Sequence, residues 1–213
     1  MPALSPLHAV VDVDVATAAG WAPTDLAQAF LDGGATWIQV RAKRLPSGPF
    51  LDLCDAVVSR ALAHGAIVIV NDRADLALLA GAAGVHVGQE DLSPTAVRRV
   101  VGTDAVVGYS THTPEQFDVA LREPATYVAV GPVFGTTTKQ TGYHPVGLEL
   151  VSTAASRAGA RPVVAIGGIT LENAASVIAA GASAVAVIGD LLSTRTPQVR
   201  TEAYLQRLVR DRV

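Results

Sequence analysis

The chain has 213 residues, half of them hydrophobic and 16% charged, which suits one compact domain and argues against a disordered chain. Its net charge of −3, with no block of basic residues, weighs against binding to nucleic acid. One cysteine, Cys54, excludes an internal disulfide framework, and the lack of a signal-peptide pattern or a long apolar run predicts a cytoplasmic protein without a membrane span.

Short runs typical of β-strands alternate along the chain with helical patterns. We expect eight strands, over residues 8–14, 37–41, 67–71, 85–87, 106–109, 127–130, 163–166 and 184–188. We expect eight helices after them, over residues 24–32, 50–63, 74–80, 94–100, 114–121, 148–157, 171–179 and 201–209. Several helix starts carry a cap and a proline, as at Ser93-Pro94 and Thr113-Pro114, and glycine marks several helix ends.

Eight strand–helix units in a chain of this length predict a (β/α)8 TIM barrel, with residues 1–213 forming a single domain. The strands are mostly apolar on both faces, as buried parallel strands are. The main rival, a doubly wound open sheet, usually has a glycine-rich turn after its first strand, whereas Asp12-Val13-Asp14 stands there. Because barrels carry their chemistry at the carboxyl ends of the strands, the residues at those ends are the candidates for a site.

Cationic and acidic side chains follow the second, third and fourth strands. Alternation places Gln39, Arg41 and Lys43 on one side of the second strand, where three long donors suit a polyanion. Asp72 and Asp91 follow the next two strands, and two carboxylates at adjacent strand ends can share Mg²⁺ with substrate phosphates. Each aspartate has an alternative role as the N-cap of the helix that follows it.

Hydroxyl groups follow the fifth and sixth strands. Ser110 can donate a hydrogen bond to a phosphate oxygen, whereas we interpret His86 and His112 as structural residues. Residues 131–142 combine glycines and threonines with Lys139, one of only two lysines in the chain. Such a loop suits a phosphate or diphosphate, and we expect it to act as a lid.

Glycines follow the seventh and eighth strands. The Gly167-Gly168 turn and Gly189 each lead into the start of a helix, which is where barrels commonly bind a phosphate group. Glycine is common in turns, so the position of these residues is the stronger evidence for a phosphate site.

Seven segments together resemble the thiamine-phosphate synthase family in order and spacing, from Gln39 to Leu192. They are QVRAK, NDR, GVHVGQEDLS, GYSTHT, GPVFGTTTK, AIGGIT and AVAV. The segment GPVFGTTTK is the most specific, whereas the GGI turn occurs in many barrels. The family transfers a hydroxymethylpyrimidine group from its diphosphate to a thiazole phosphate, so the resemblance implies a Mg²⁺-assisted transferase with two small-molecule substrates.

The resemblance also implies a role for individual residues. Those holding the diphosphate would be Arg41, Lys43, Asn71, Ser110 and Lys139. Gln39 would touch the pyrimidine, and Asp72 and Asp91 would bind Mg²⁺. Those holding the thiazole phosphate would be Thr136, Thr138, Gly167, Gly168 and Gly189, and Ile188 would be a further substrate-binding residue. Those expected to act in catalysis, by stabilising charge on the leaving diphosphate, are Arg41, Lys43, Ser110 and Lys139.

The chain departs from the family pattern at Ala42, Gly135 and Gly189, where Glu, Pro and Ser are common. The third change removes a hydroxyl from the expected thiazole-phosphate site. Alternative functions are a thiazole tautomerase of the same fold, a Schiff-base aldolase and a non-catalytic barrel that binds a phosphorylated metabolite. The tautomerase branch has His where this chain has Pro132, and the aldolase needs a desolvated lysine on a strand. The sequence leaves open whether the chain forms a homo-oligomer.

Overall fold

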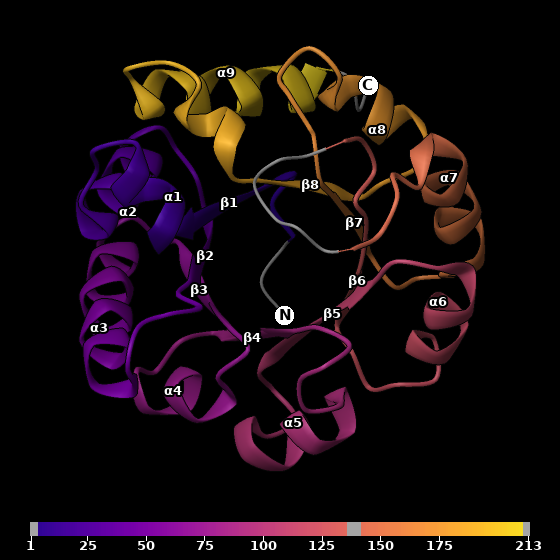
Figure 1. The fold of residues 1–213 in the computed structure, drawn as a ribbon, viewed down its shortest axis with the longest axis horizontal. Coiled ribbons are helices and arrows are strands. Elements are labelled where there is room, and N and C mark those ends of the chain that lie inside the picture. Colours follow the sequence, from indigo (N-terminus) through magenta and orange to yellow (C-terminus); the bar gives the residue numbers. More distant parts are fainter. Residues whose placement is uncertain (1–3, 136–141, 211–213) are drawn as a thin grey trace.

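The computed structural model describes residues 4–135 and 142–210, in which eight parallel strands close into a barrel (Figure 1). Each strand pairs with the next one along the chain, and the last pairs with the first. The strands are β1 (Leu7–Asp12), β2 (Trp37–Arg41), β3 (Ile67–Asn71), β4 (Gly84–Val87), β5 (Val106–Thr111), β6 (Tyr127–Val130), β7 (Val163–Ile166) and β8 (Ala184–Val187). This arrangement confirms the predicted (β/α)8 barrel and excludes the open sheet. The domain bounds 1–213 stay a prediction.

Helices form a ring outside the strands (Figure 1). They are α1 (Val13–Ala18), α2 (Pro23–Asp32), α3 (Ser47–Ala63), α4 (Ala74–Leu79), α5 (Pro94–Val101), α6 (Pro114–Ala120), α7 (Gly147–Arg157), α8 (Ala174–Ala179), the short 3-10 helix η1 (Gly189–Leu192) and α9 (Pro197–Arg210). The sequence patterns predicted neither α1 nor η1. The first strand is correspondingly shorter than predicted, because its last two expected residues belong to α1.

Side-chain caps explain where several helices begin. The hydroxyl of Ser93 accepts a hydrogen bond from the backbone N–H of Ala96 at 3.2 Å, as predicted for the start of α5. The hydroxyl of Thr113 caps α6 in the same way. Asp12 caps the unpredicted helix α1, because its Oδ1 accepts from the N–H of Val15 at 3.1 Å.

A polar turn delays the start of α8, which begins at Ala174 and not at Leu171 as predicted. Oδ1 of Asn173 accepts from the N–H of Thr170 at 2.8 Å, and Nδ2 of Asn173 donates to the carbonyl of Gly168 at 3.1 Å. These bonds hold residues 168–173 as a turn at the mouth of the barrel, so the helix starts only after it.

Apolar side chains form two layers, one on each face of the barrel wall. On β1, Val10 belongs to one cluster, whereas its neighbours Ala9 and Val11 belong to the other, as alternation along a strand requires. The smaller cluster, which includes Trp37, Ile69 and Tyr127, fills the barrel interior. The larger one packs the wall against the helices and includes the buried Cys54, as expected.

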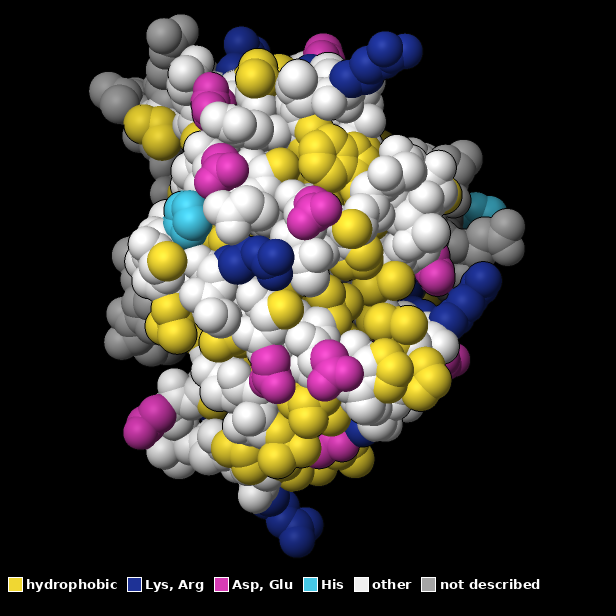
Figure 2. Space-filling model, turned by 90° about the vertical axis from the view of Figure 1, so that its left-hand side faces the viewer, with side chains coloured by type: hydrophobic (Ala, Val, Ile, Leu, Met, Phe, Trp, Pro, Cys, Tyr) yellow, Lys and Arg dark blue, Asp and Glu magenta, His cyan; other side chains and the backbone are white. Residues whose placement is uncertain are grey.

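The outer surface mixes charged and apolar side chains. On the face shown in Figure 2, Lys and Arg side chains lie apart from one another, among acidic and uncharged groups. Within the part of the chain that the structure describes, none of the helices is long and apolar enough to cross a membrane.

Candidate functional site

A cavity of about 780 Å³ lies at the carboxyl ends of the strands. Its lining includes every predicted site residue that the structure describes, namely Gln39, Arg41, Lys43, Asn71, Asp72, Asp91, Ser110, Gly167, Gly168, Ile188 and Gly189. The predicted residues Thr136, Thr138 and Lys139 lie outside the described residues. The barrel therefore brings together predicted residues that are up to 150 positions apart, from residue 39 to residue 189.

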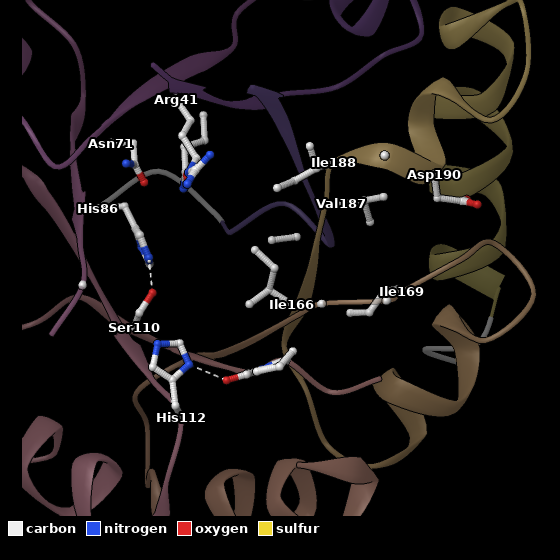
Figure 3. Close-up of a pocket in the computed structure, with 18 of the residues that line it drawn as sticks. Arg41, Asn71, His86, Ser110, His112, Ile166, Ile169, Val187, Ile188 and Asp190 are labelled. Atoms are coloured by element: carbon white, nitrogen blue, oxygen red, sulfur yellow. Dashed lines mark hydrogen bonds between the residues drawn. The ribbon is translucent and has the colours of Figure 1, made fainter. Parts of the chain in front are cut away.

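The two sides of the cavity differ in chemistry. Figure 3 shows Arg41, Asn71 and His86 on one side, from β2, β3 and β4. Ile166 and Ile188 project from the opposite side, where the chain leaves β7 and β8. One half of the cavity thus offers two cations with hydrogen-bonding groups, and the other offers apolar side chains and glycine turns together with Thr170, Asp190 and Ser193.

The two cationic side chains on the polar side each form an ion pair with an aspartate at the end of a neighbouring strand. Arg41 pairs with Asp12, which lies directly opposite it in the register of β1 and β2. Lys43 pairs with Asp72 at the end of β3. Asp12 is buried, with only 3% of its side chain exposed, and sequence reasoning assigned it no role. The sequence evidence for a role was its position near the end of the first predicted strand.

Asp72 has an unusual backbone conformation for a residue other than glycine. Its φ of 65° lies in the left-handed region, and its N–H donates to the carbonyl of His86 at 2.8 Å. The alternative role as an N-cap is wrong, because Arg73 occupies that position and α4 has no side-chain cap. Burial raises the pKa of the Asp72 carboxyl, the hydrogen bond from Lys43 opposes this rise, and a hydrogen bond with Asp91 adds to it.

Asp91 lies beside Asp72 and is held by the turn after β4. Its Oδ2 accepts from the N–H of Gly88 at 2.8 Å. The alternative role as the cap of α5 is wrong, because Ser93 caps that helix. Among residues 4–135 and 142–210, no group of three or more His, Cys, Asp or Glu side chains comes close enough to hold a metal ion.

Ser110 is held from two directions at the end of β5. Its Oγ lies 2.8 Å from Nε2 of His86 on β4 (Figure 3). Its backbone carbonyl accepts from Nε2 of Gln89 at 2.6 Å. His86 is buried, as the sequence predicted, and it also faces the cavity.

His112 connects β5 to the segment after β6. Nδ1 of its ring lies 2.5 Å from the carbonyl oxygen of Gly131, and the ring stacks on Tyr143 with centroids 4.2 Å apart. Its backbone N–H donates to Oε1 of Gln116 at 2.7 Å. These contacts agree with the predicted structural role.

The turn after β7 requires glycine at both of its positions. Gly167 and Gly168 have φ values of 100° and 63°. A Cβ atom on Gly167 would lie 2.6 Å from Cα of Pro132, and one on Gly168 would lie 2.5 Å from the carbonyl oxygen of Gly135. The turn therefore packs directly on the start of the loop after β6.

Replacing Gly168 with alanine is expected to lower the free energy of unfolding by about 2–4 kcal/mol, from about 1 kcal/mol of backbone strain plus steric overlap. Gly65 is the matched control, because its φ of 64° is nearly the same while a Cβ atom added there would meet nothing within 4 Å. Urea unfolding should show that Gly65→Ala loses only about 1 kcal/mol. Equal losses in the two variants would contradict a packed turn.

Asp190 ties the two glycine turns to the last helix, a role that sequence reasoning missed. Its Oδ2 accepts from the N–H of Leu171 at 3.1 Å, from Nη2 of Arg200 at 2.8 Å and from the hydroxyl of Tyr204 at 2.5 Å. Burial raises the pKa of the Tyr204 hydroxyl, and the hydrogen bond to Asp190 adds to that rise. The sequence evidence for such a role was the position of Asp190 shortly after the last predicted strand.

Comparison with known proteins identifies relatives over most of the chain. Residues 9–191 match the family described as thiamine monophosphate synthase. The chain is 43% identical over 209 residues to a thiamine-phosphate synthase from Koribacter versatilis, covering 95% of each protein. It is 45% identical over 179 residues to one from Roseiflexus castenholzii, covering 84% of this chain and 78% of the relative. The structure of a thiamine phosphate pyrophosphorylase from Pyrococcus furiosus is similar over 96% of both chains, with a TM-score of 0.87 and 27% identity.

Proposed function

The chain belongs to the thiamine monophosphate synthase family. We propose that its cavity transfers the hydroxymethylpyrimidine group from its diphosphate to the thiazole phosphate. The protein is a transferase of thiamine biosynthesis, as its relatives are. In the proposed reaction, the bond between the pyrimidine methylene carbon and the diphosphate oxygen breaks, and its electron pair leaves with the diphosphate. The lone pair of the thiazole nitrogen then forms the new C–N bond, which gives thiamine phosphate.

The division of the cavity into two unlike sides is the observation that supports this proposal most strongly. Gln39, Arg41, Lys43, Asn71 and Ser110 line the side with cations and hydrogen-bond donors. Such groups suit a diphosphate, on which negative charge increases as the C–O bond breaks. The glycine turns at residues 167–168 and 189 suit the smaller phosphate of the thiazole. Two anionic substrates can then meet with their reactive atoms between the two sides.

Arg41 and Lys43 would stabilise the leaving diphosphate, together with Asn71 and Ser110. Arginine provides a planar set of donors for phosphate oxygens, and lysine provides a compact charge. Gln39, which is 6% exposed, would contact the pyrimidine from the floor of the cavity. We include Thr136, Thr138 and Lys139 in the substrate site, and Ile188 beside Gly189, on the strength of the family resemblance.

Asp72 and Asp91 fit the magnesium ion that we propose for the reaction. They provide two carboxylates from the segments after adjacent strands, where Asp91 helps to raise the pKa of Asp72, and both line the cavity. Mg²⁺ prefers oxygen ligands and commonly uses one or two carboxylates with phosphate oxygens and water. When bound, the ion would neutralise part of the charge on the diphosphate.

Incubation of the protein with both substrates and Mg²⁺ tests the proposed function. We expect thiamine phosphate and diphosphate to appear in equal amounts, measured by chromatography and by a coupled diphosphate assay. Omitting either substrate, or chelating the metal, should stop both signals. If no thiamine phosphate forms with all three components present, the proposed function is wrong.

The cytoplasm is the place of reaction that we propose, and the oligomeric state stays open.

A further inference from the structure

A chain of hydrogen bonds runs from Ser110 into the interior of the barrel. Oγ of Ser110 lies 2.8 Å from Nε2 of His86, and Nδ1 of His86 lies 2.9 Å from the hydroxyl of Tyr127. His86 is 8% exposed and Tyr127 is 1% exposed, so the chain runs from the cavity into the apolar interior. The three residues come from the neighbouring strands β5, β4 and β6.

Gly108 creates the space in which His86 meets Tyr127. In the barrel register, Gly108 on β5 pairs with His86 on β4 and with Tyr127 on β6, so it lies between them. A Cβ atom at Gly108 would collide with the Tyr127 hydroxyl and with Nδ1 of His86. The contact between the two rings therefore depends on a glycine two residues before Ser110, on the same face of β5.

The burial of Tyr127 decides which way the hydrogen bonds point. Tyr127 packs with the apolar interior cluster and edge-on against the buried ring of His8, and His86 Nδ1 is the hydrogen-bond partner of its hydroxyl among the described residues. A buried hydroxyl hydrogen without an acceptor costs about 1–3 kcal/mol. The phenol is therefore the donor and Nδ1 the acceptor. Since a neutral imidazole carries one N–H, that hydrogen is on Nε2, where it donates to Oγ of Ser110.

We propose that Tyr127 and His86 are positioning residues that keep the Ser110 hydroxyl hydrogen free to point into the cavity. With Oγ accepting from His86, the hydrogen of Ser110 can donate to a substrate oxygen. In the opposite tautomer, Ser110 would donate to His86 instead. Phosphate oxygens on the leaving diphosphate act as acceptors, so only the first arrangement provides a preorganised donor for them. This inference rests on the proposed function, which assigns Ser110 to the diphosphate.

NMR of the protein labelled with ¹⁵N-histidine tests the hydrogen-bond direction without any substrate. We expect the His86 ring to carry its hydrogen on Nε2, with Nδ1 bare, at neutral pH. The His86 signals can be assigned by their loss in His86→Asn. A hydrogen on Nδ1 in the wild-type protein would overturn the proposal. This measurement gives an answer even if the assay for thiamine phosphate fails, so the two hypotheses can be told apart.

The variant Tyr127→Phe tests the consequence for turnover. It keeps the buried ring and removes the donor to Nδ1, so the preference for the Nε2–H tautomer weakens. We expect kcat to fall about three- to tenfold, the loss corresponding to one neutral hydrogen bond, while the KM for thiazole phosphate stays unchanged. Ile69→Val is the matched control, because Ile69 belongs to the same interior cluster and contacts none of the three residues by hydrogen bond. It should lower the Tm without changing kcat.

The same substitution in a Ser110→Ala background separates positioning from a purely structural role. Without the serine hydroxyl there is nothing for Tyr127 to orient, so Tyr127→Phe should then change kcat by less than about twofold. If Tyr127→Phe lowers kcat equally with and without Ser110, Tyr127 acts through the fold and the proposal is wrong. A wild-type kcat in the single variant Tyr127→Phe would overturn it as well.

Discussion

Replacing Ser110 with alanine is expected to lower kcat by about 10²–10³, the usual cost of removing one preorganised donor to a developing anion. The Ser110 hydroxyl is held by His86 at 2.8 Å and its carbonyl by Gln89 at 2.6 Å, so the donor is fixed before the substrate binds. Because the backbone contacts remain, the variant should keep its fold. Release of diphosphate under saturating substrate is the measurement.

The neighbouring residue Thr111 provides the control for this prediction. Its hydroxyl is buried on the opposite face of β5 and donates to the carbonyl of Ala129 at 2.9 Å. Thr111→Val removes the hydroxyl of the adjacent residue, which is more deeply buried than Ser110 and does not line the cavity, at a cost of about 1 kcal/mol in stability. We expect its kcat to match the wild type. A Ser110→Ala variant with near-normal kcat would remove Ser110 from the catalytic residues.

Replacing Asp12 with alanine is expected to lower the free energy of unfolding by about 3–5 kcal/mol, because the buried guanidinium of Arg41 then loses its carboxylate. The side chains of Arg41 and Asp12 are only 14% and 3% exposed, so water cannot replace the lost partner fully. Asp12 also caps α1 by accepting from the N–H of Val15. Urea unfolding at neutral pH measures the loss.

Two further variants divide this effect into its parts. Asp12→Asn removes the charge but keeps an oxygen that can cap α1, so it should be more stable than Asp12→Ala by about 1 kcal/mol. Asp14→Ala is the exposed control: Asp14 lies 3.7 Å from Arg44, and their side chains are 48% and 85% exposed. Such a pair contributes less than about 1 kcal/mol. If Asp12→Ala destabilises the protein no more than Asp14→Ala, the buried ion pair does not stabilise the barrel.

Arg41 and its partner Asp12 illustrate how far the sequence could predict this site. Alternation along one strand was enough to put Gln39, Arg41 and Lys43 on one side of β2, and all three line the cavity. The partner of Arg41 lies 29 positions earlier, and their contact depends on the register between β1 and β2. No local pattern encodes that register, so Asp12 received no role.

The helices show a similar limit on a shorter scale. Ser93-Pro94 and Thr113-Pro114 were predicted correctly because cap and proline act within a few residues of each other. The predicted start of α8 was wrong because the Asn173 side chain forms hydrogen bonds with the backbone of Thr170 and Gly168. These bonds make a turn in a segment whose apolar pattern was typical of a helix. Side-chain bonds to the backbone compete with helix formation, and hydrophobic periodicity does not reveal them.

The alternation of strands and helices, the polar residues at the strand ends and the family resemblance follow from the sequence, because these features depend on short-range periodicity and on local motifs. Which of those residues meet depends on the closed barrel. Closure of the barrel set Asp12 against Arg41, Asp72 beside Asp91, and His86 across Gly108 from Tyr127. The physical reason is that such contacts depend on strand register and on the room left by one missing side chain, both of which are properties of the whole barrel.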